Sequence, residues 1–433
     1  MTSIDSLYQL YLKHPQISTD TRTISSGCLF FALKGENFDA NQFAEKAIED
    51  GAAYAVIDHP DFKLDERYLL VPDALEALQQ LATLHRSQLS IPVIGLTGSN
   101  GKTTTKELIN SVLSEKYRTF ATRGNLNNHI GVPLSILSIA KETEIAVIEM
   151  GANHQKEIEF LCRIAQPTHG LITNVGLAHL DGFGGFEGVK KGKAELYAYL
   201  KAHGGIAFVC QDSPYLPEMA RNAGLEKLND YGSSSSDSIS GTLLKSDPFI
   251  EISWTNGQGT FHTILNLTGA YNFENILAAV SIADFFELNP QQINKGLSGY
   301  APKNNRSQIT KTEHNTVICD FYNANPSSMS AALKNIALIS AEHKTVVIGD
   351  MFELGAESAE QHNLIAREAA LLDLDRVILI GKQFYTLKDE LDVLFFERPE
   401  EAKAYLESNP VKDNLVLLKG SRGMALEQLL PLL

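Results

Sequence analysis

The sequence predicts an α/β protein with three domains. Its 433 residues are enough for about two to four domains of ordinary size. Short apolar runs with the length of buried strands alternate with stretches of helical spacing, which is typical of parallel sheets covered by helices. This pattern changes near residues 88 and 305. We therefore expect domains at residues 1–88, 89–305 and 306–433.

The first domain should be small and of mixed type. Residues 27–33 and 52–58 are predicted strands, because each is a short apolar run. Residues 41–51 have helical spacing and finish at Gly51, a residue that commonly terminates helices.

The central domain should contain a mostly parallel sheet. A helix is predicted at 104–117, and strands are predicted at 91–96, 144–150 and 169–176. Later in the domain, Asn256 and Gly257 separate two extended runs, which predicts a β-hairpin.

The third domain repeats the alternation as an independent, Rossmann-like unit. Its strands are predicted at residues 316–322, 345–351, 375–381 and 414–420, with helical stretches between them.

Composition favours a cytoplasmic protein. No apolar run approaches the roughly 20 residues of a membrane span, and the N-terminus lacks the basic start and apolar centre of a secretion signal. The cysteines are widely spaced and form no CxxC pattern, so we expect reduced thiols without a disulfide or zinc site: Cys28, Cys162, Cys210 and Cys319.

The charge balance limits the partners. With 37 basic and 52 acidic residues the net charge is −15, so we expect neither nucleic acid nor a membrane as partner. An anionic substrate would have to be bound by a few local basic groups. We expect a monomer.

A glycine-rich loop between a strand and a helix predicts a nucleotide site. In "TGSNGKTTT" the glycines let backbone N–H groups turn toward a phosphate, the helix start adds partial positive charge, Lys102 reaches the terminal phosphates and Thr103 offers a hydroxyl to Mg²⁺. The strict pattern has glycine where this chain has Leu96, so a chance turn is the alternative. The predicted phosphate-binding residues are Gly98, Ser99, Asn100, Gly101, Lys102, Thr103 and Thr104.

Several polar residues follow predicted strands or begin predicted helices. Glu149 ends a buried strand, where a carboxylate is well placed to hold Mg²⁺, although it also fits an acid facing water. Taken alone, His179 fits a packed or capping residue, and Lys193 fits a solvated helix lysine. Asn272 and Asn275 fit helix caps.

A denser polar cluster follows the predicted strand 316–322. It is unusual for a plain turn, although Ser327 would also serve as a simple helix cap. Its members are Asp320, Tyr322, Asn323, Asn325 and Pro326.

Longer motifs resemble the Mur ligases, and the resemblance covers nearly the whole chain. It is greatest to the members that add D-alanyl-D-alanine to a UDP-N-acetylmuramoyl tripeptide. The N-terminal "STDTRTISSGCLFFALKGENFDANQFAEKAIEDGA" resembles the uridine-binding domain that these members share with the diamino-acid-adding ones. The motifs, in order, are "TGSNGKTTTKE", "GNLNNHIGVPLSIL", "EMGAN", "ITNVGLAHLDGFG", "KAEL", "YNANPSSM" and "GDMFELG".

The resemblance implies an ATP-dependent amide ligation in peptidoglycan precursor synthesis. ATP would phosphorylate the terminal carboxylate of the tripeptide, and the amine of D-alanyl-D-alanine would displace phosphate from the acyl phosphate. Concentrated positive charge, including Mg²⁺, would be needed because the reactants are anionic.

The resemblance also implies roles for individual residues. Lys102, His179 and Lys193 are assigned to catalysis, and Thr103, Glu149, His179 and Lys193 to metal binding. Lys193 matches a lysine that many Mur ligases carbamoylate with CO₂, which would turn a cation into an anion that faces magnesium. Further nucleotide contacts are implied for Asn275, Arg306, Asp320 and Asn323.

Substrate contacts are implied in two groups. "GDMFELG" and "LKGSRG" are expected to face the cleft and help position the dipeptide. The uridine diphosphate would lie along Ser18, Thr19, Asp20, Arg22, Phe30, Ala32, Leu33 and Lys34. The muramoyl group would pass Asn125, Asn127, Asn128 and His129.

The chain departs from the family pattern at three places. It has "DANQF" where the family often has "DGHDF", and Lys156 where the family has glycine in "MGxxxxGEI". The arginine motif before the third domain reads "KNNRSQ" and lacks its usual glycine. These departures leave the reaction class intact but loosen the placement of uridine and ATP.

Four alternatives remain. A diamino-acid-adding Mur ligase would carry a D-N-P-R motif, which is absent, and a folylpolyglutamate synthase would lack the uridine-binding domain. The third is a nucleotide-gated switch or binding module without ligation; a guanine-specific switch would need an N-K-x-D stretch, which is also absent. A noncatalytic relative would not be expected to keep Lys102, Glu149, His179 and Lys193 together.

Overall fold

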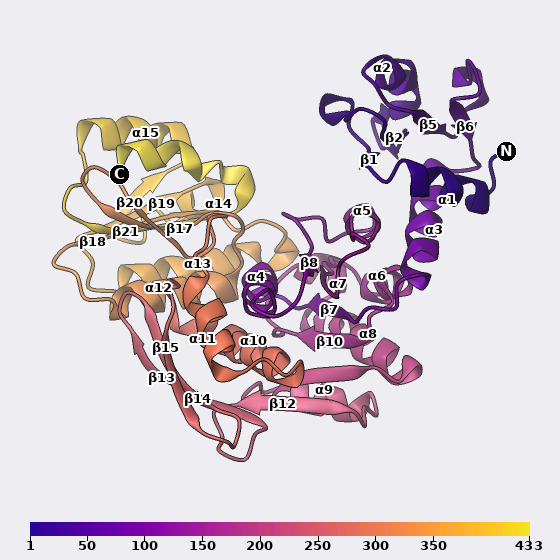
Figure 1. Cartoon of the computed structure of the whole chain (residues 1–433). Helices are drawn as coiled ribbons and strands as arrows, with labels where there is room; N and C mark the ends of the chain where they lie inside the picture. Colours follow the sequence, from indigo (N-terminus) through magenta and orange to yellow (C-terminus); the bar gives the residue numbers. More distant parts are fainter.

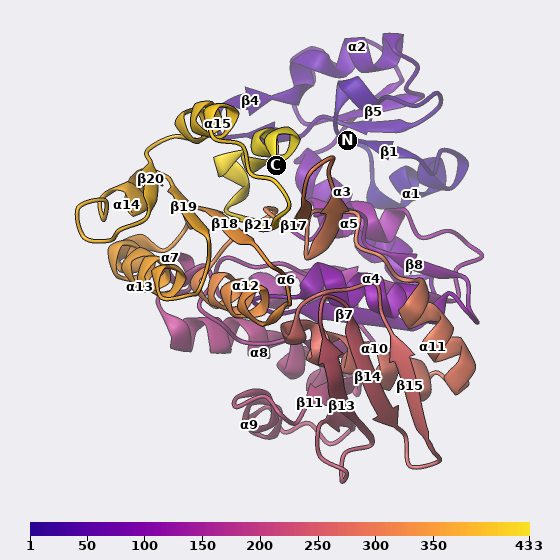
Figure 2. The same cartoon turned by 90° about the vertical axis from the view of Figure 1, so that its left-hand side faces the viewer.

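The computed structural model describes all 433 residues, which form three domains around separate sheets (Figure 1). In Figure 1 the N-terminal domain stands at the upper right and the C-terminal domain at the left. The view in Figure 2 shows the same three parts turned by 90°. None of the helices combines the length and apolar character that a membrane span requires.

The N-terminal domain has a four-stranded parallel sheet in the order β1-β2-β5-β6. The two strands and the helix predicted here are confirmed in type and order. The strands are β1 (Ile17–Ser18), β2 (Leu29–Phe31), β5 (Tyr54–Ile57) and β6 (Tyr68–Leu70), and β3 (Lys34–Gly35) pairs with β4 (Phe38–Asp39). The helices are α1 (Ile4–Lys13), α2 (Ala44–Glu49) and α3 (Ala74–Ser87).

The central domain has a nine-stranded sheet in the order β15-β14-β13-β12-β11-β10-β7-β9-β8. Its strands are β7 (Val93–Thr97), β8 (Thr119–Ala121), β9 (Ile145–Glu149), β10 (His169–Ile172), β11 (Ile206–Cys210), β12 (Leu228–Gly232), β13 (Ile239–Ser246), β14 (Ile250–Thr255) and β15 (Thr260–Ile264). Every residue of β7 and β9 is buried, which explains why both read as continuous apolar runs.

Pairing in this sheet is parallel from β8 to β13 and antiparallel from β13 to β15. The predicted hairpin is confirmed, with Gly257 at φ 82° in the turn between β14 and β15. The helices are α4 (Lys102–Leu113), α5 (Gly131–Leu137), α6 (Glu157–Ala165), α7 (Leu180–Phe183), α8 (Phe186–His203), α9 (Leu216–Asn222), α10 (Phe273–Phe285) and α11 (Pro290–Gly299).

The C-terminal domain has a six-stranded sheet in the order β16-β17-β21-β18-β19-β20, with only the edge strand β16 antiparallel. The four predicted strands are confirmed. The strands are β16 (Gln308–Lys311), β17 (Thr316–Asp320), β18 (Lys344–Gly349), β19 (Arg376–Ile380), β20 (Leu394–Phe396) and β21 (Leu415–Lys419). The helices are α12 (Pro326–Leu338), α13 (Ser358–Ala370), α14 (Lys382–Tyr385) and α15 (Pro399–Ser408).

The hydrophobic cores divide the molecule unequally. One cluster of 68 buried residues runs from α1 and α3 of the N-terminal domain through the whole central domain. The C-terminal domain has two clusters of its own, one on each face of its sheet. The four cysteines are buried and unpaired.

Candidate active site

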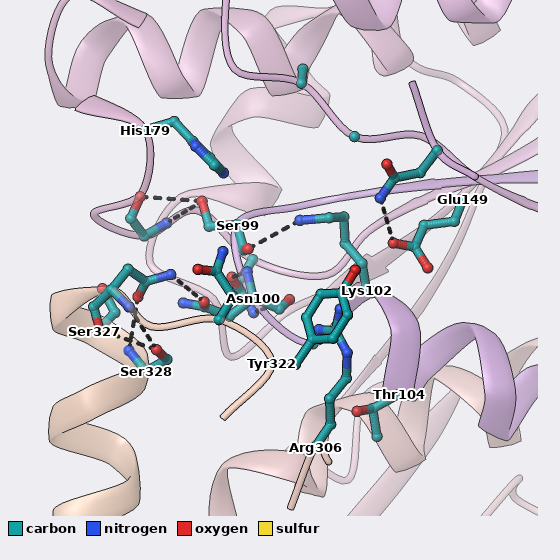
Figure 3. Close-up of a pocket in the computed structure, with 18 of the residues that line it drawn as sticks. Ser99, Asn100, Lys102, Thr104, Glu149, His179, Arg306, Tyr322, Ser327 and Ser328 are labelled. Carbon is teal, nitrogen blue, oxygen red and sulfur yellow. Dashed lines mark hydrogen bonds between the residues drawn. The ribbon is translucent and has the colours of Figure 1, made fainter. Parts of the chain in front are cut away.

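A cavity of about 950 Å³ lies where the central and C-terminal domains meet, and 38 residues line it. It opens at the C-terminal ends of β7, β9 and β10, where open α/β sheets bind ligands. The start of α12 and the end of β17 form the facing wall. Figure 3 shows Ser327 and Ser328 at the start of α12.

The glycine loop follows β7 and leads directly into α4. Gly101 has φ 76°, a left-handed conformation, and a Cβ there would lie 2.8 Å from the side-chain nitrogen of Asn275. A Cβ on Gly98 would lie 1.9 Å from Oγ1 of Thr173. Both positions therefore require glycine, and the loop keeps its backbone open toward the cavity.

Lys102 is folded back into this loop. Its Nζ donates hydrogen bonds to the carbonyl oxygens of Gly98 at 2.7 Å and Ser99 at 3.1 Å. Burial lowers the pKa of Lys102 to about 8, against an opposing effect of the Glu149 charge. The ammonium group is thus held beside the loop without a carboxylate directly bound to it.

Glu149 ends β9 and is 1% exposed, so the alternative of an acid facing water is wrong. It accepts a hydrogen bond from Oγ1 of Thr103 at 3.1 Å and one from Nδ2 of Asn127 at 2.9 Å. Nζ of Lys106 lies 3.6 Å away. A hydroxyl and a carboxylate side by side next to a phosphate-binding loop are the hard oxygen donors that fit Mg²⁺.

His179 follows β10 in a left-handed conformation, with φ 53°. Its ring points into the cavity in Figure 3. Nδ1 contacts the carboxylate of Glu353, which the "GDMFELG" segment brings from the C-terminal domain. Burial lowers the pKa of His179, which favours the neutral ring that binds metals.

Lys193 lies inside α8 and is 2% exposed, so the alternative of a solvated lysine is wrong. Its ammonium group sits 5.1 Å from the ring centre of Phe183 and has no ion-pair partner. Burial, and then the charge of Lys102, lower the pKa of Lys193 to about 7. A buried lysine with a pKa this low has a much larger neutral fraction near pH 7 than an ordinary lysine, and the neutral amine is the form that reacts with CO₂.

Four residues implied for nucleotide contacts line one end of the cavity: Asn275, Arg306, Asp320 and Asn323. The guanidinium of Arg306 stacks on the ring of Tyr322, with 3.8 Å between group and ring centre (Figure 3). Asn272 stands at the N-cap position of α10, but its side chain donates to the Thr268 carbonyl and makes no cap bond. The capping role of Asn275 is wrong, because Asn275 lies inside α10 and donates to Asn272.

Lys419 belongs to the "LKGSRG" segment that was expected to face the cleft, but no individual role was predicted for it. It lines the same end of the cavity and is 1% exposed. Nζ of Lys419 donates to Asp320 at 2.7 Å. Asp320 also accepts the backbone N–H of Ser307 at 3.3 Å, and the Ser307 hydroxyl lies 2.7 Å from that of Tyr271. The feature of the sequence that could have identified Lys419 is its position at the end of an apolar strand and before a glycine.

The C-terminal domain touches the glycine loop through the start of α12. Asn325 caps α12 by accepting the N–H of Ser328, and its own Nδ2 donates to Oδ1 of Asn100 at 2.7 Å. Ser327 does not cap the helix; its hydroxyl accepts the N–H of Leu177 instead.

The implied substrate residues fall into two places. Asn125, Asn127, Asn128 and His129 line the cavity. The N-terminal set lies outside it: Ser18, Thr19, Asp20, Arg22, Phe30, Ala32, Leu33 and Lys34. Phe30, Ala32 and Leu33 are buried, so their side chains are not available to a ligand.

The charged residues of the N-terminal set already have partners. Arg22 and Asp20 form an ion pair at 2.6 Å, and hydrogen bonds from Arg22 lower the pKa of Asp20 to about 2. Lys34 pairs with Asp58 at 2.8 Å. An arriving diphosphate would have to compete with these carboxylates for the two basic groups.

Family comparisons match three consecutive segments of the chain. Residues 15–86 match the Mur ligase family catalytic domain, residues 96–283 match the Mur ligase middle domain, and residues 305–422 match the Mur ligase glutamate ligase domain.

Individual relatives match over nearly the full length. The UDP-N-acetylmuramoyl-tripeptide–D-alanyl-D-alanine ligase of Bacillus subtilis is 36% identical, covering 95% of this chain and 92% of its own. A crystal structure of MurF from Acinetobacter baumannii is 34% identical, with a TM-score of 0.87 and coverage of 96% and 92%. The MurF ligase of Thermotoga maritima in complex with ADP is 26% identical, with a TM-score of 0.86 and coverage of 100% and 98%.

Proposed function

The chain belongs to the Mur ligase family, and from this premise we propose that it adds D-alanyl-D-alanine to a UDP-N-acetylmuramoyl tripeptide in an ATP-dependent ligation. The observation that carries the proposal is one cavity that joins a glycine loop, the Lys102 ammonium group and the Glu149 carboxylate. Relatives that bear the name of this ligase match about the whole chain, and an ADP complex of one of them supports ATP as the nucleotide.

Two bond exchanges account for the ligation. An oxygen of the tripeptide carboxylate attacks the γ-phosphorus of ATP, ADP leaves and an acyl phosphate forms. The amine nitrogen of D-alanyl-D-alanine then attacks the acyl carbon and loses a proton, and phosphate leaves with the former carboxylate oxygen. The first exchange is needed because a carboxylate repels nucleophiles and would have to expel oxide.

The nucleotide would lie along the loop and the wall formed by the C-terminal domain. Backbone N–H groups of residues 98–104 and the Lys102 ammonium would bind the phosphates, once Lys102 leaves the carbonyls of Gly98 and Ser99. Asn275, Arg306, Asp320 and Asn323, which share one end of the cavity, would hold the adenosine.

The residues present also fit magnesium. Thr103 and Glu149 would hold one ion, and His179, with Glu149 and a carbamate on Lys193, would hold a second. Bound Mg²⁺ supplies neutralisation of the anionic reactants and alignment of their oxygens. The buried, unpaired Lys193 supports carbamoylation, because the neutral amine is the form that reacts with CO₂.

Each domain would then have its own task. Residues 1–88 would bind the UDP end of the substrate, residues 89–305 ATP and magnesium, and residues 306–433 would close on ATP with the dipeptide. The contact between Asn325 and Asn100 supports a closing motion that excludes water from the acyl phosphate. As an enzyme of peptidoglycan precursor synthesis, the protein would act in the cytoplasm.

Oxygen-18 tracing tests the acyl phosphate. With the label in the terminal carboxylate of the tripeptide, one labelled oxygen should appear in the released phosphate for each amide formed. Amide formation with unlabelled phosphate would contradict the mechanism.

Phosphate release with different amines tests the substrate. We expect release that depends on the UDP-muramoyl tripeptide and D-alanyl-D-alanine together. Release with diaminopimelate or lysine on a dipeptide acceptor would instead indicate a diamino-acid-adding ligase.

A further inference from the structure

Lys156 stands in a strained position at the edge of the cavity. It immediately precedes α6 with φ 69°, a left-handed conformation that is unfavourable for lysine and free of strain for glycine. Its side chain lines the cavity. Strained backbone of this kind concentrates at functional sites, so the side chain at this position needs an explanation.

The ammonium group of Lys156 has no partner in the protein. Four lysine and arginine residues line the cavity, and the other three are engaged by carbonyl oxygens, a tyrosine ring or a carboxylate: Lys102, Arg306 and Lys419. Only the backbone N–H of Lys156 is bonded, to Glu195. A cation without a protein partner is therefore available at the edge of a substrate-binding space.

The neighbouring acidic groups do not neutralise this cation. Oε2 of Glu157 accepts the N–H groups of Asn153 and His154, at 2.6 and 3.0 Å. The Glu195 carboxylate accepts the N–H groups of Lys156 and Glu159. Both carboxylates are thus occupied with the start of α6, and an incoming anion would find the Lys156 ammonium available.

Lys156 lies at the end of the cavity that the acceptor acid should occupy. The nucleotide end is formed by α10 and the C-terminal domain, whereas α6 packs against α3 and α5, on the side of the N-terminal domain (Figure 1). Glu195 of α8 accepts the backbone N–H of Lys156, which fixes the start of α6 at this side of the cavity. Lys156 therefore lies on the side of the cavity away from the proposed nucleotide end.

An apolar surface leads to the ammonium group. Phe160 lies one helical turn after Lys156, and its N–H donates to the Lys156 carbonyl at 3.1 Å. Both side chains line the cavity, and Phe160 is 37% exposed. A ligand with an aliphatic side chain that ends in a carboxylate fits this arrangement, because the aliphatic part would pack on the Phe160 ring and the carboxylate would bind the Lys156 ammonium.

We propose that Lys156 is a specificity-determining residue that binds a second carboxylate, at the far end of an aliphatic side chain, on the residue whose main-chain carboxylate is activated. This inference rests on the proposed function. Diaminopimelate carries such a carboxylate. Lysine ends in an ammonium group alone, which Lys156 would repel.

The test compares two UDP-muramoyl tripeptides, ending in diaminopimelate or in lysine, across three variants. Lys156→Gln should lower kcat/KM about tenfold for the diaminopimelate peptide, through KM, because one charged hydrogen bond is lost. The same variant should leave kcat/KM for the lysine peptide unchanged or raise it. Lys156→Arg should keep most of the preference, since it keeps the cation.

Lys156→Gly separates binding from folding. It removes the backbone strain and should raise the melting temperature, yet it should lose the preference as Lys156→Gln does. If kcat/KM changed equally for both peptides, the Lys156 ammonium would be binding a group that both peptides share, and the assignment would be overturned. A preference that stayed the same in the variants would also overturn it.

Calorimetric titration of both peptides gives the same comparison without turnover. Failure of the wild-type protein to ligate either peptide would count against the proposed function. Unequal binding that depends on Lys156 would still support the carboxylate site, and equal binding would overturn it.

Discussion

Nζ of Lys419 donates a hydrogen bond of 2.7 Å to Oδ2 of Asp320, although the two residues are 99 positions apart. They are opposite each other at the ends of the parallel strands β17 and β21. Their side chains are 2% and 15% exposed. The pair therefore fixes a carboxylate at the edge of the proposed nucleotide site.

Lys419→Met should destabilise the protein and weaken ATP binding. It leaves the Asp320 carboxylate without its cation, which costs about 3 kcal/mol when a buried pair is broken on one side. We also expect the KM for ATP to rise about tenfold, because Asp320 loses its fixed orientation. Urea denaturation and ATP titrations measure the two effects, and the exposed Lys412→Met is the control.

Lys419→Met combined with Asp320→Asn tests the coupling. Without the unpaired charge, the double variant should be less destabilised than the sum of the single ones. Additive losses would mean that the pair does not act as a unit.

Gly101→Ala should abolish ATP binding. It forces alanine into a left-handed conformation and places a methyl group 2.8 Å from the Asn275 amide. Gly204 after α8 has a similar φ of 68°, with nothing near its Cβ position, so Gly204→Ala is a matched control. The control should lose about 1 kcal/mol of stability and keep its affinity for ADP, measured by calorimetry. Equal ADP affinity in both variants would contradict the role of the loop.

Lys193 should make stability depend on pH. Its pKa is lowered to about 7 in the folded protein by burial, whereas a lysine in the unfolded chain titrates near 10.4. Between these values the unfolded chain binds the additional proton, so stability increases with pH. Relative to Lys193→Met, the wild-type protein should gain about 1 kcal/mol per pH unit from about pH 7.5 to 9 in CO₂-free buffer without ligands. Equal slopes would show that Lys193 keeps its proton and is not prepared for carbamoylation.

Glu353 should support metal binding through His179. The Glu353 carboxylate contacts Nδ1 of His179, which favours a proton there and leaves Nε2 to bind a metal. Removing a carboxylate that hydrogen-bonds a histidine ligand typically lowers metal affinity or activity about 10- to 100-fold, so Glu353→Ala should lower Mg²⁺ affinity or activity by this factor. Turnover at increasing Mg²⁺ concentration and calorimetric titration with Mg²⁺ measure the loss, with the exposed Glu357→Ala as control. An unchanged Mg²⁺ requirement would contradict the role.

Features set by local sequence were predictable. Buried parallel strands read as apolar runs, and the glycine loop lies between β7 and α4 as its residues require. The Asn256–Gly257 hairpin depended on turn chemistry alone.

Features set by contacts between distant segments were not predictable from local pattern. Lys193 has the same helical surroundings in sequence as Lys191, but only Lys193 faces the interior. The partnership of Lys419 with Asp320 depends on the strand order β17-β21, and that of His179 with Glu353 on the docking of two domains. Likewise, the Ser327 hydroxyl does not cap α12, because it accepts the N–H of the distant Leu177 instead.

The continuous core of the first two domains has a thermodynamic consequence. Most buried apolar residues from α1 to α11 share one hydrophobic cluster, with a small separate cluster on the other face of the N-terminal sheet, whereas residues from β16 onward are stabilised by two others. Denaturation should therefore proceed in two cooperative steps, with the C-terminal third melting on its own. Nucleotide would couple the two steps into one by bridging both units. Amide hydrogen exchange should accordingly divide the chain near residue 305 without ATP and lose that division with it.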